Sequence, residues 1–314
     1  MSTEDDIPFN RDFPLKPGVV EEVVPGVRRV LCNNPSPLTF TGTLSYIVGR
    51  GQVAIIDPGP DDAAHAQALL GAVRSETVTH IIVTHTHIDH SPNAARIQAA
   101  TGATIYAEGP HRASRPRHDS ETISSDSGAD RDFRPDALVS DGDMIEGGGF
   151  RLEAIATPGH TANHLAFALA DRDLIFVGDH VMGWSTSIVA PPDGSMVDYM
   201  ASLERLAARP EQLYLSGHGP EIHDAPRYAR FLARHRKARE ASILHRLAKG
   251  EADIPTIVRA SYIGIDPRLV NAAGYSVLAH LEDLVARGVV ATDGDAVIGG
   301  SYRLTSPFPP LAGG

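Results

Sequence analysis

The sequence has almost no cysteine: Cys32 is the single one among 314 residues. An internal disulfide is therefore excluded, which is typical of proteins from a reducing compartment. Long apolar runs are also missing, since no window approaches the roughly 18 consecutive apolar residues of a membrane-spanning helix. The first ten residues, MSTEDDIPFN, are acidic and polar and lack the basic and then apolar order of a secretory signal. We therefore expect a cytoplasmic protein without a membrane partner.

Basic residues are outnumbered by acidic ones, 28 Lys and Arg against 39 Asp and Glu, so the formal net charge is -11. This charge argues weakly against a protein that grips long nucleic acid over its whole surface. The distribution is uneven: residues 119–146 contain nine acids against two Arg, and residues 226–249 contain eight Lys and Arg against one Glu. Each stretch is most simply a solvated face. The basic stretch has a second interpretation, which is contact with a polyanion.

Short β-rich runs alternate with turns and a few helices from residue 19 to about residue 219. The expected strands are 27–31, 44–48, 53–56, 80–84, 104–106, 151–156, 165–169, 174–177 and 213–215. The expected helices are 62–74, 92–100 and 197–208. This mixture predicts a layered α/β fold in which helices cover sheets. We expect one domain over residues 1–225, with a polar segment at 112–143 that is a long insert or a flexible lid.

The character of the sequence changes after Gly219. Residues 225–249 predict a long basic helix that Gly250 ends, and a short helix near Pro255 and a longer one over 267–287 follow. Two β-like runs on either side of Asp293-Gly294 predict a hairpin. These elements predict a small winged-helix-like module within a C-terminal domain at 226–314. We expect its tail, 307–314, to be disordered.

The densest group of potential metal ligands lies in THTHIDH, residues 84–90. Three histidines and an aspartate follow the apolar run IIV there: His85, His87, Asp89 and His90. His85 and His87 are two positions apart, so in an extended turn their rings can point the same way. The following Ser-Pro pair is typical of a helix start. This turn holds more nitrogen and oxygen ligands than one tetrahedral zinc takes from a single loop, which favours two metals.

Three later apolar runs end in the same manner. LEAIA leads to His160 in TPGH, LIFV leads to Asp179 in GDH, and LYLS leads to His218 in GHG. Each candidate lies close to a glycine, which permits a tight turn. A further run, VAII, ends at Asp57. Strand ends gathered at one edge of a layered fold can bring such side chains together.

Together these residues resemble the metallo-β-lactamase superfamily, with HxHxDH at 85–90 and then His160, Asp179 and His218 in order. The resemblance covers about the first 220 residues. It implies an αββα sandwich and two divalent metal ions, with zinc expected and manganese or iron as alternatives. It also implies two ligand sets, His85, His87 and His160 for the first ion, and Asp89, His90 and His218 for the second. Asp179 would bridge the two ions.

The resemblance further implies a zinc-dependent hydrolase in which the ions lower the pKa of a shared water. Three catalytic candidates accompany the ligands. Asp89 is a candidate to orient the water. Asp57 is a candidate to accept a hydrogen bond from a ligand histidine, with a plain Asp-Pro-Gly turn as the alternative. His164 is a candidate proton donor or substrate contact, with a packed histidine as the alternative, and we expect His180 to be packed.

The stretches TPGHTANH and VGDHVMG and the winged-helix-like module resemble the subgroup called β-lactamase-like protein 2. This wider resemblance covers nearly the whole chain and makes single-stranded RNA one candidate substrate. The long acidic insert departs from the subgroup, and so does His180, which stands where the animal form has cysteine. Both changes leave the substrate open.

The alternative is a hydrolase of a small thioester, ester or lactone, of the glyoxalase II type. Two other classes are a di-iron redox protein and a metal sensor without catalysis. Residues 255–305 contain four Arg and five acids, so we expect no sequence-specific DNA binding from the winged-helix-like module. We interpret it as a scaffold, a lid or an element of a homo-oligomer.

Overall fold

The computed structural model describes residues 8–119, 121, 128–250 and 252–306. The predicted disordered tail at 307–314 lies outside these residues.

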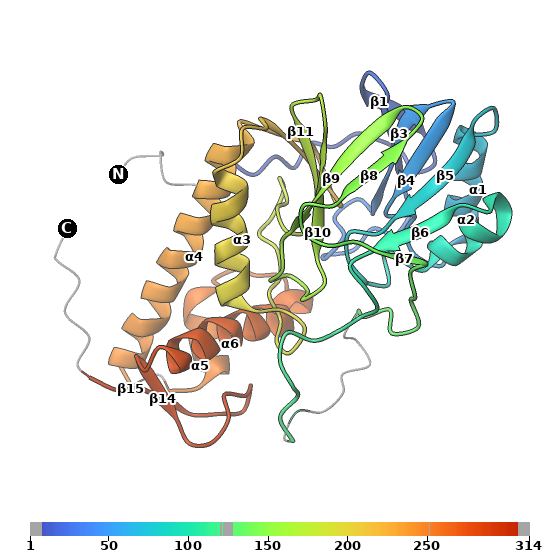
Figure 1. Ribbon diagram of the computed structural model, residues 1–314. Coiled ribbons are helices and arrows are strands. Elements are labelled where there is room, and N and C mark those ends of the chain that lie inside the picture. Colours follow the sequence, from blue (N-terminus) through green and yellow to red (C-terminus); the bar gives the residue numbers. More distant parts are fainter. Residues whose placement is uncertain (1–7, 120, 122–127, 251, 307–314) are drawn as a thin grey trace.

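Thirteen strands form two sheets that face each other (Figure 1). The first sheet has the order β1-β2-β3-β4-β5-β6-β7, and its strands are Val20–Val24, Val27–Leu31, Leu44–Arg50, Gln52–Ile56, Thr77–Ile82, Thr104–Ala107 and Ala137–Leu138. The second has the order β13-β12-β11-β10-β9-β8, and its strands, from β8 to β13, are Met144–Gly147, Phe150–Ala156, Leu165–Leu169, Leu174–Gly178, Leu213–Ser216 and Ile222–His223.

Helices cover the outer face of each sheet (Figure 1). On one side lie α1 (Ala63–Ala72) and α2 (Asn93–Thr101), which pack on the first sheet through a cluster that includes Leu69 and Ile97. On the other side lie α3 (Met196–Ala207) and α4 (Ala225–Ala248), which pack on the second sheet. A third cluster fills the space between the sheets. The predicted α/β class and αββα sandwich are confirmed.

The C-terminal module contains α5 (Ile254–Ser261), a 3-10 turn at Pro267–Leu269, α6 (Val270–Ala286), β14 (Val290–Thr292) and β15 (Tyr302–Leu304). The predicted hairpin exists, since β14 pairs with β15 in antiparallel fashion. Its connection is not the expected tight turn at Asp293-Gly294 but the longer segment 293–301. This segment packs on the module, because Ala296 is buried and the Tyr302 hydroxyl donates to the Val297 carbonyl at 2.6 Å.

The basic helix α4 belongs to two cores. Tyr228 and Leu232 in its first half pack with the second sheet and α3. Ile243 and Leu247 in its second half pack with α5 and α6. The helix therefore ties the C-terminal module to the sandwich, and the division of the chain at 225/226 stays a prediction.

The described parts of the insert at 112–143 are held in place by several contacts. Arg115 pairs with Glu282 of α6 at 2.5 Å, and the Ser114 hydroxyl donates to the Pro192 carbonyl at 2.8 Å. Further along, Ile88 N–H donates to the Gly128 carbonyl at 2.7 Å, next to the predicted ligands. These contacts favour an anchored insert over a flexible lid. Among the described residues, no helix is long and apolar enough to span a membrane.

Candidate metal centre

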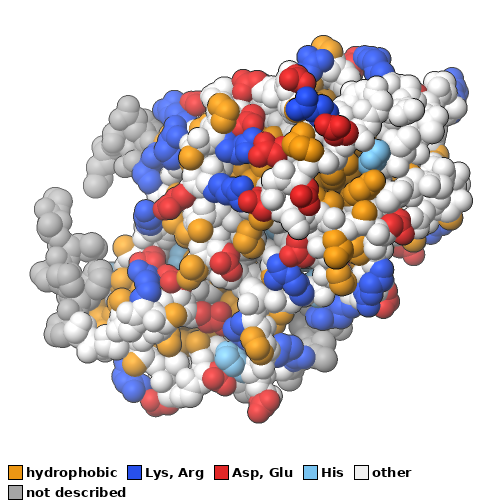
Figure 2. All heavy atoms as spheres, in the orientation of Figure 1, with side chains coloured by type: hydrophobic (Ala, Val, Ile, Leu, Met, Phe, Trp, Pro, Cys, Tyr) orange, Lys and Arg blue, Asp and Glu red, His pale blue; other side chains and the backbone are white. Residues whose placement is uncertain are grey.

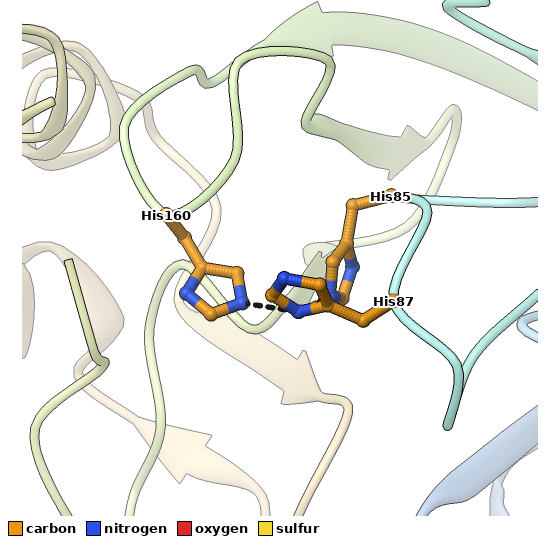
Figure 3. Close-up of side chains that lie close together, drawn as sticks. All are labelled: His85, His87 and His160. Atoms are coloured by element: carbon orange, nitrogen blue, oxygen red, sulfur yellow. Dashed lines mark hydrogen bonds between the residues drawn. The ribbon is translucent and has the colours of Figure 1, made fainter. Parts of the chain in front are cut away.

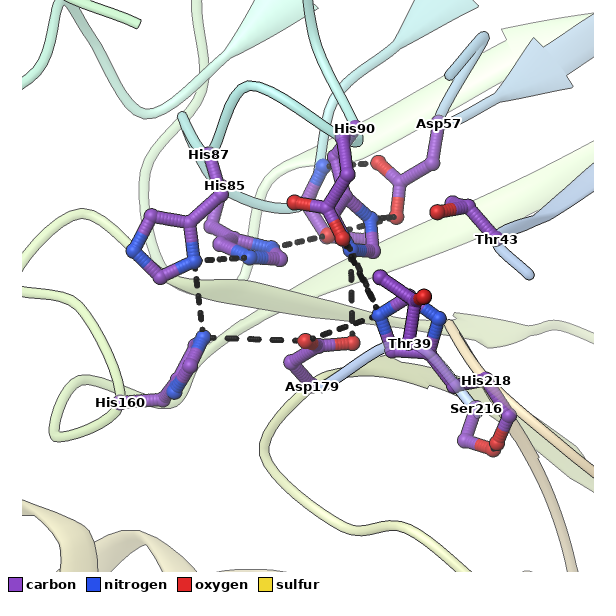
Figure 4. A network of polar contacts seen from close by, with 12 residues as sticks. Thr39, Thr43, Asp57, His85, His87, His90, His160, Asp179, Ser216 and His218 are labelled. Atoms are coloured by element: carbon purple, nitrogen blue, oxygen red, sulfur yellow. Dashed lines mark hydrogen bonds and ion pairs between the residues drawn. The ribbon is translucent and has the colours of Figure 1, made fainter. Parts of the chain in front are cut away.

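Strand ends from both sheets meet at one edge of the sandwich and carry the seven predicted ligands, of which Figure 4 labels all but Asp89. The first sheet contributes the turn between β5 and α2. The second contributes the loop between β9 and β10 and the residues after β11 and β12. The side chains that meet are His85, His87, Asp89, His90, His160, Asp179 and His218.

Three imidazoles form the first group of donor atoms (Figure 3). The Nδ1 atom of His87 lies 3.1 Å from Nε2 of His85 and 3.0 Å from Nε2 of His160. His85 and His160 are buried and His87 is half-buried, so most of these nitrogens face one another away from bulk water. Three imidazole nitrogens converging on one point suit a zinc-like cation.

The second group combines one carboxylate with two imidazoles. Oδ2 of Asp89 lies 3.3 Å from Nε2 of His218 and 3.6 Å from Nε2 of His90. The two histidine nitrogens are 3.4 Å apart. Asp89 is the most open member, with 23% of its side chain exposed, whereas both histidine side chains are buried. Solvent therefore reaches this group on the side of Asp89.

Asp179 lies between the two groups (Figure 4). Its Oδ2 atom is 3.8 Å from Nε2 of His160 in the first group and 3.3 Å from Nε2 of His218 in the second. Its Oδ1 atom is 3.4 Å from Nε2 of His90 but is buried without a hydrogen bond among the described residues. A buried carboxylate oxygen without a partner is costly unless a cation or proton satisfies it.

The second ring nitrogens of the histidines are held by oxygen atoms outside the two groups. Nδ1–H of His160 donates to the Ile188 carbonyl at 2.6 Å, and Nδ1–H of His218 donates to the Gly42 carbonyl at 3.1 Å. Nδ1–H of His90 donates to the Asp57 carboxylate at 3.0 Å. Each of these bonds turns Nε2 of its ring toward the centre, where it offers a lone pair whenever it carries no proton.

Thr84 holds the ring of His85 in the same manner. Its hydroxyl donates to Asp57 at 2.7 Å and accepts from Nδ1–H of His85 at 2.9 Å. Nε2 of His85 therefore also keeps a free lone pair. A donor set of imidazoles and carboxylates, already oriented, fits divalent metal ions.

Burial and charge affect the two groups differently. Burial lowers the pKa of His87 to about 3 and lowers that of His160 as well, so these rings are neutral. Burial opposes protonation of His218 too, but the Asp179 carboxylate outweighs it and raises the pKa of His218 to about 10. The pKa of His90 is raised in the same way, with Asp89 as the main attracting charge. The carboxylate-rich group therefore attracts positive charge, which a metal cation supplies.

Two glycines leave room for this arrangement. A Cβ atom on Gly217 would lie 2.5 Å from Oδ1 of Asp179 and 2.6 Å from Cε1 of His90. Gly178, at φ 47°, would meet Nε2 of His164 at 2.6 Å. The glycines beside the predicted ligands therefore serve close approach of side chains as well as tight turns.

The other predicted site residues differ in position. Asp57 lies under the centre and accepts a hydrogen bond from His90, and its role in orienting a metal ligand stays a prediction. His164 is only 1% exposed, stacks on His85 with ring centroids 5.1 Å apart, and pairs with the Thr157 hydroxyl at 2.8 Å. This buried position favours the packed-histidine alternative over proton donation to a substrate. His180 is fully buried and donates to the Tyr199 carbonyl at 3.3 Å.

Sequence reasoning missed a polar network behind the ligand turn. His111 pairs with the Thr86 hydroxyl at 3.1 Å, and Asn163 donates to the same hydroxyl at 2.9 Å. On its other side His111 faces Asp193 at 3.5 Å. The network links the turn at residues 84–90 to the loops that carry His160 and follow Asp179. No spacing in the sequence indicates it.

An αββα sandwich with a histidine- and aspartate-lined centre at one edge defines a metal-dependent hydrolase fold. The family model described as "Metallo-beta-lactamase superfamily" matches residues 38–218, which is more than half of the chain. The chain belongs to the metallo-beta-lactamase superfamily. A second model, "Beta-lactamase associated winged helix domain", matches residues 254–300 and confirms the predicted winged-helix-like module.

Named relatives and solved structures agree with this assignment. The chain is 30% identical over 236 residues to an atrochrysone carboxyl ACP thioesterase of Claviceps purpurea, covering 73% of this chain and 68% of that protein. It is 28% identical over 273 residues to the lactamase-like protein adaB of Aspergillus niger, covering 81% and 78%. A metallo-beta-lactamase family protein of Thermus thermophilus has the same fold, with a TM-score of 0.72 at 22% identity over 90% of this chain and all of that one. A beta-lactamase domain protein of Burkholderia ambifaria gives 0.74 at 20% identity, over 93% and 96%.

Proposed function

We propose that the chain is a hydrolase that uses two divalent metal ions, with zinc as the expected metal, to cleave a small thioester. The position of Asp179 between two groups of three donors carries this proposal. His85, His87 and His160 would hold one ion. Asp89, His90 and His218 would hold the other, and the Asp179 carboxylate would contact both.

When bound, two such ions act as Lewis acids that lower the pKa of water and polarise the carbonyl of the substrate. The protein prepares the centre for them. The Ile188 and Gly42 carbonyls and the Asp57 carboxylate fix the histidine tautomers. Asp89, the most open member of its group, is the candidate to accept a proton from the attacking water and to orient it.

The relative in Claviceps purpurea supports a thioester as the substrate, because its name describes a thioesterase and its identity to this chain is 30%. The basic helix α4 gives little support to RNA. Its exposed Arg227 pairs with Asp224, Lys237 lies 3.9 Å from Glu204, and Arg230 donates to the Ala207 carbonyl. Figure 2 shows Lys and Arg along the side where α4 lies, with acidic side chains among them. Arg227 and Lys237 therefore each have an acidic side chain close by.

Metal analysis of protein purified without added metal tests the centre. We expect two equivalents per chain, with zinc dominating over manganese and iron. Asp179→Ala should lose metal, because both groups of donors lose a shared ligand. His223→Gln is the matched control, since His223 is exposed and lies outside the centre. Iron in place of zinc would favour the redox class instead.

A substrate panel tests the activity. Thioesters, lactones and single-stranded RNA are supplied to the metal-loaded protein and to Asp89→Ala. We expect thioester hydrolysis that Asp89→Ala abolishes. Cleavage of RNA alone would overturn the thioester proposal, and retained metal without any hydrolysis would favour the sensor class.

A further inference from the structure

A cavity of about 260 Å³ lies where the segment after Asp179 meets α4 and the C-terminal module. Apolar side chains form much of its wall, among them Met182, Trp184, Tyr262 and Ile265. Its volume falls just below the range of pockets that hold drug-sized molecules. The cavity therefore suits one short chain or a single ring.

Two arginines of α4 give this cavity a cationic wall. Arg236 is 3% exposed, donates from one guanidinium nitrogen to the Ser187 carbonyl, and keeps a buried Nε–H without a partner among the described residues. Arg239 donates to the Ser261 carbonyl at 2.8 Å and lies 4.1 Å over the Tyr262 ring. Neither guanidinium is paired with a carboxylate in the part of the chain that the structure describes.

The positive field of the two arginines acts on nearby histidines. Burial, reinforced by Arg236 and Arg239, lowers the pKa of His235 to about 4 and that of His280 to about 3. Both rings are therefore neutral. A desolvated cation beside an apolar wall is costly unless an anion pairs with it.

The cavity is linked to the candidate metal centre through two consecutive residues. Ser187 accepts a hydrogen bond from Arg236, and the Ile188 carbonyl accepts one from Nδ1 of His160. Both residues also line the cavity. The segment that orients a predicted metal ligand therefore also forms part of the cavity wall.

We propose that this cavity binds the far end of the substrate's acyl group and that this end carries an anion, a carboxylate or a phosphate. The inference rests on the proposed thioester hydrolase and specifies its substrate class: short acyl groups with an apolar middle and a terminal negative charge. Arg239 would pair with the anion, and the nearby charge of Arg236 would add to the attraction. The apolar wall would hold the chain between them.

Trp184 makes the test direct, because it lines the cavity and is the only tryptophan in the sequence. Its fluorescence is followed while the metal-loaded protein is titrated with hexanoate, hexyl phosphate or hexanamide. We expect saturable changes with the two anions and binding of the neutral amide that is at least roughly tenfold weaker, as the loss of a charged hydrogen bond predicts. The tighter of the two anions identifies the terminal group.

Arg239→Gln is the test variant, because Arg236 is too deeply buried to replace without disturbing the fold. Binding of the better anion should weaken by roughly tenfold or more. Arg234→Gln is the matched control, since Arg234 is exposed on the same helix, lies over Phe231 and does not line the cavity. Equal binding of hexanoate and hexanamide, or equal weakening by both variants, would overturn the proposal.

Kinetics separate this proposal from the proposed function. Adipoyl and hexanoyl thioesters of N-acetylcysteamine are compared in the same preparations. We expect a higher kcat/KM for the adipoyl thioester and loss of that preference in Arg239→Gln. Thioester hydrolysis without any preference or anion binding would sink the anion site and leave the hydrolase. Anion binding at Trp184 without hydrolysis of either thioester would sink the hydrolase and the assignment of the cavity to its acyl group.

Discussion

Asp57 lies beneath His90 and accepts a hydrogen bond from its Nδ1–H at 3.0 Å. The same carboxylate accepts from the backbone N–H and the hydroxyl of Thr84, both at 2.7 Å. Thr84 in turn holds His85. One buried aspartate therefore orients a ring in each of the two donor groups, although neither of its oxygens has to face a metal ion.

Asp57→Ala should weaken metal binding without removing a proposed ligand. The loss of such an orienting partner typically costs about 10- to 100-fold in metal affinity. The measurement is a competition titration against a chelator of known affinity. Asp61→Ala is the control, because Asp61 is a surface residue on the same turn that pairs with Arg96. Equal affinity in the wild type and in Asp57→Ala would show that Asp57 does not orient the ligands.

Gly217→Ala should damage the centre through volume alone. The added Cβ would lie 2.5 Å from Oδ1 of Asp179 and 2.6 Å from Cε1 of His90, and both side chains are buried with little freedom to move. We expect reduced metal content and reduced hydrolysis. Gly71→Ala in α1 is the matched control, since nothing lies within 4 Å of its added Cβ. That variant should keep its metal and gain about 0.4–1 kcal/mol in stability. Full metal content in Gly217→Ala would contradict the steric argument.

The candidate ligands could be singled out because they follow apolar strands, and His160, Asp179 and His218 also lie near a glycine. The strands could be predicted from their apolar residues. β10 and β11, for example, are buried along their whole length and form continuous apolar runs in the sequence. β1 was missed because Val20–Val24 is a largely exposed edge strand without a buried face. β7 and β13 have two residues each, too few to show a period.

The partners that hold the ligands could not be predicted. Gly42 and Ile188 act through backbone carbonyls, which every residue possesses. The Gly42 carbonyl is also 176 positions from His218 in the sequence. That α4 packs into two cores could not be predicted either. Its apolar positions in the sequence show that one face is buried, but not that its two halves are buried by different parts of the protein. Such contacts depend on how distant elements pack.

Because Arg115 anchors the insert, replacing it should lower the stability of the protein and also expose the insert to proteolysis. Arg115 pairs with both Glu121 and Glu282, and burial raises the pKa of Glu282. Arg115→Met would leave Glu282 largely enclosed without its cation, at a cost of about 1–3 kcal/mol. Chemical unfolding and limited proteolysis measure the two effects, and cleavage in the insert should be faster. Arg131→Met, an exposed change in the same insert, should alter neither. An unchanged cleavage rate in Arg115→Met would favour the flexible lid.

His280 predicts a pH dependence of stability that comes from outside the metal centre. Its ring is 1% exposed, and neither nitrogen has a partner among the described residues. Burial, together with the charges of Arg236, Arg239, His235 and Arg287, lowers its pKa to about 3 in the folded protein. In the unfolded chain the pKa is about 6.5, so the unfolded state binds the extra proton between these two values. The folded protein therefore loses stability as the pH falls from about 6.5 toward 3. For this residue the loss amounts to about 2 kcal/mol at pH 5.

Urea unfolding of the wild type and of His280→Leu at pH 8 and pH 5 measures this effect. Other groups titrate alike in the two proteins, so the difference between them isolates His280. The loss of stability between the two pH values should be smaller in His280→Leu by about 2 kcal/mol. His223→Gln, at an exposed position, should keep the full loss. If His280→Leu loses as much stability as the wild type, the pKa of His280 is not lowered by folding. The ring would then be protonated in the folded protein at pH 5, and the effect assigned to burial and to Arg236 and Arg239 would be wrong.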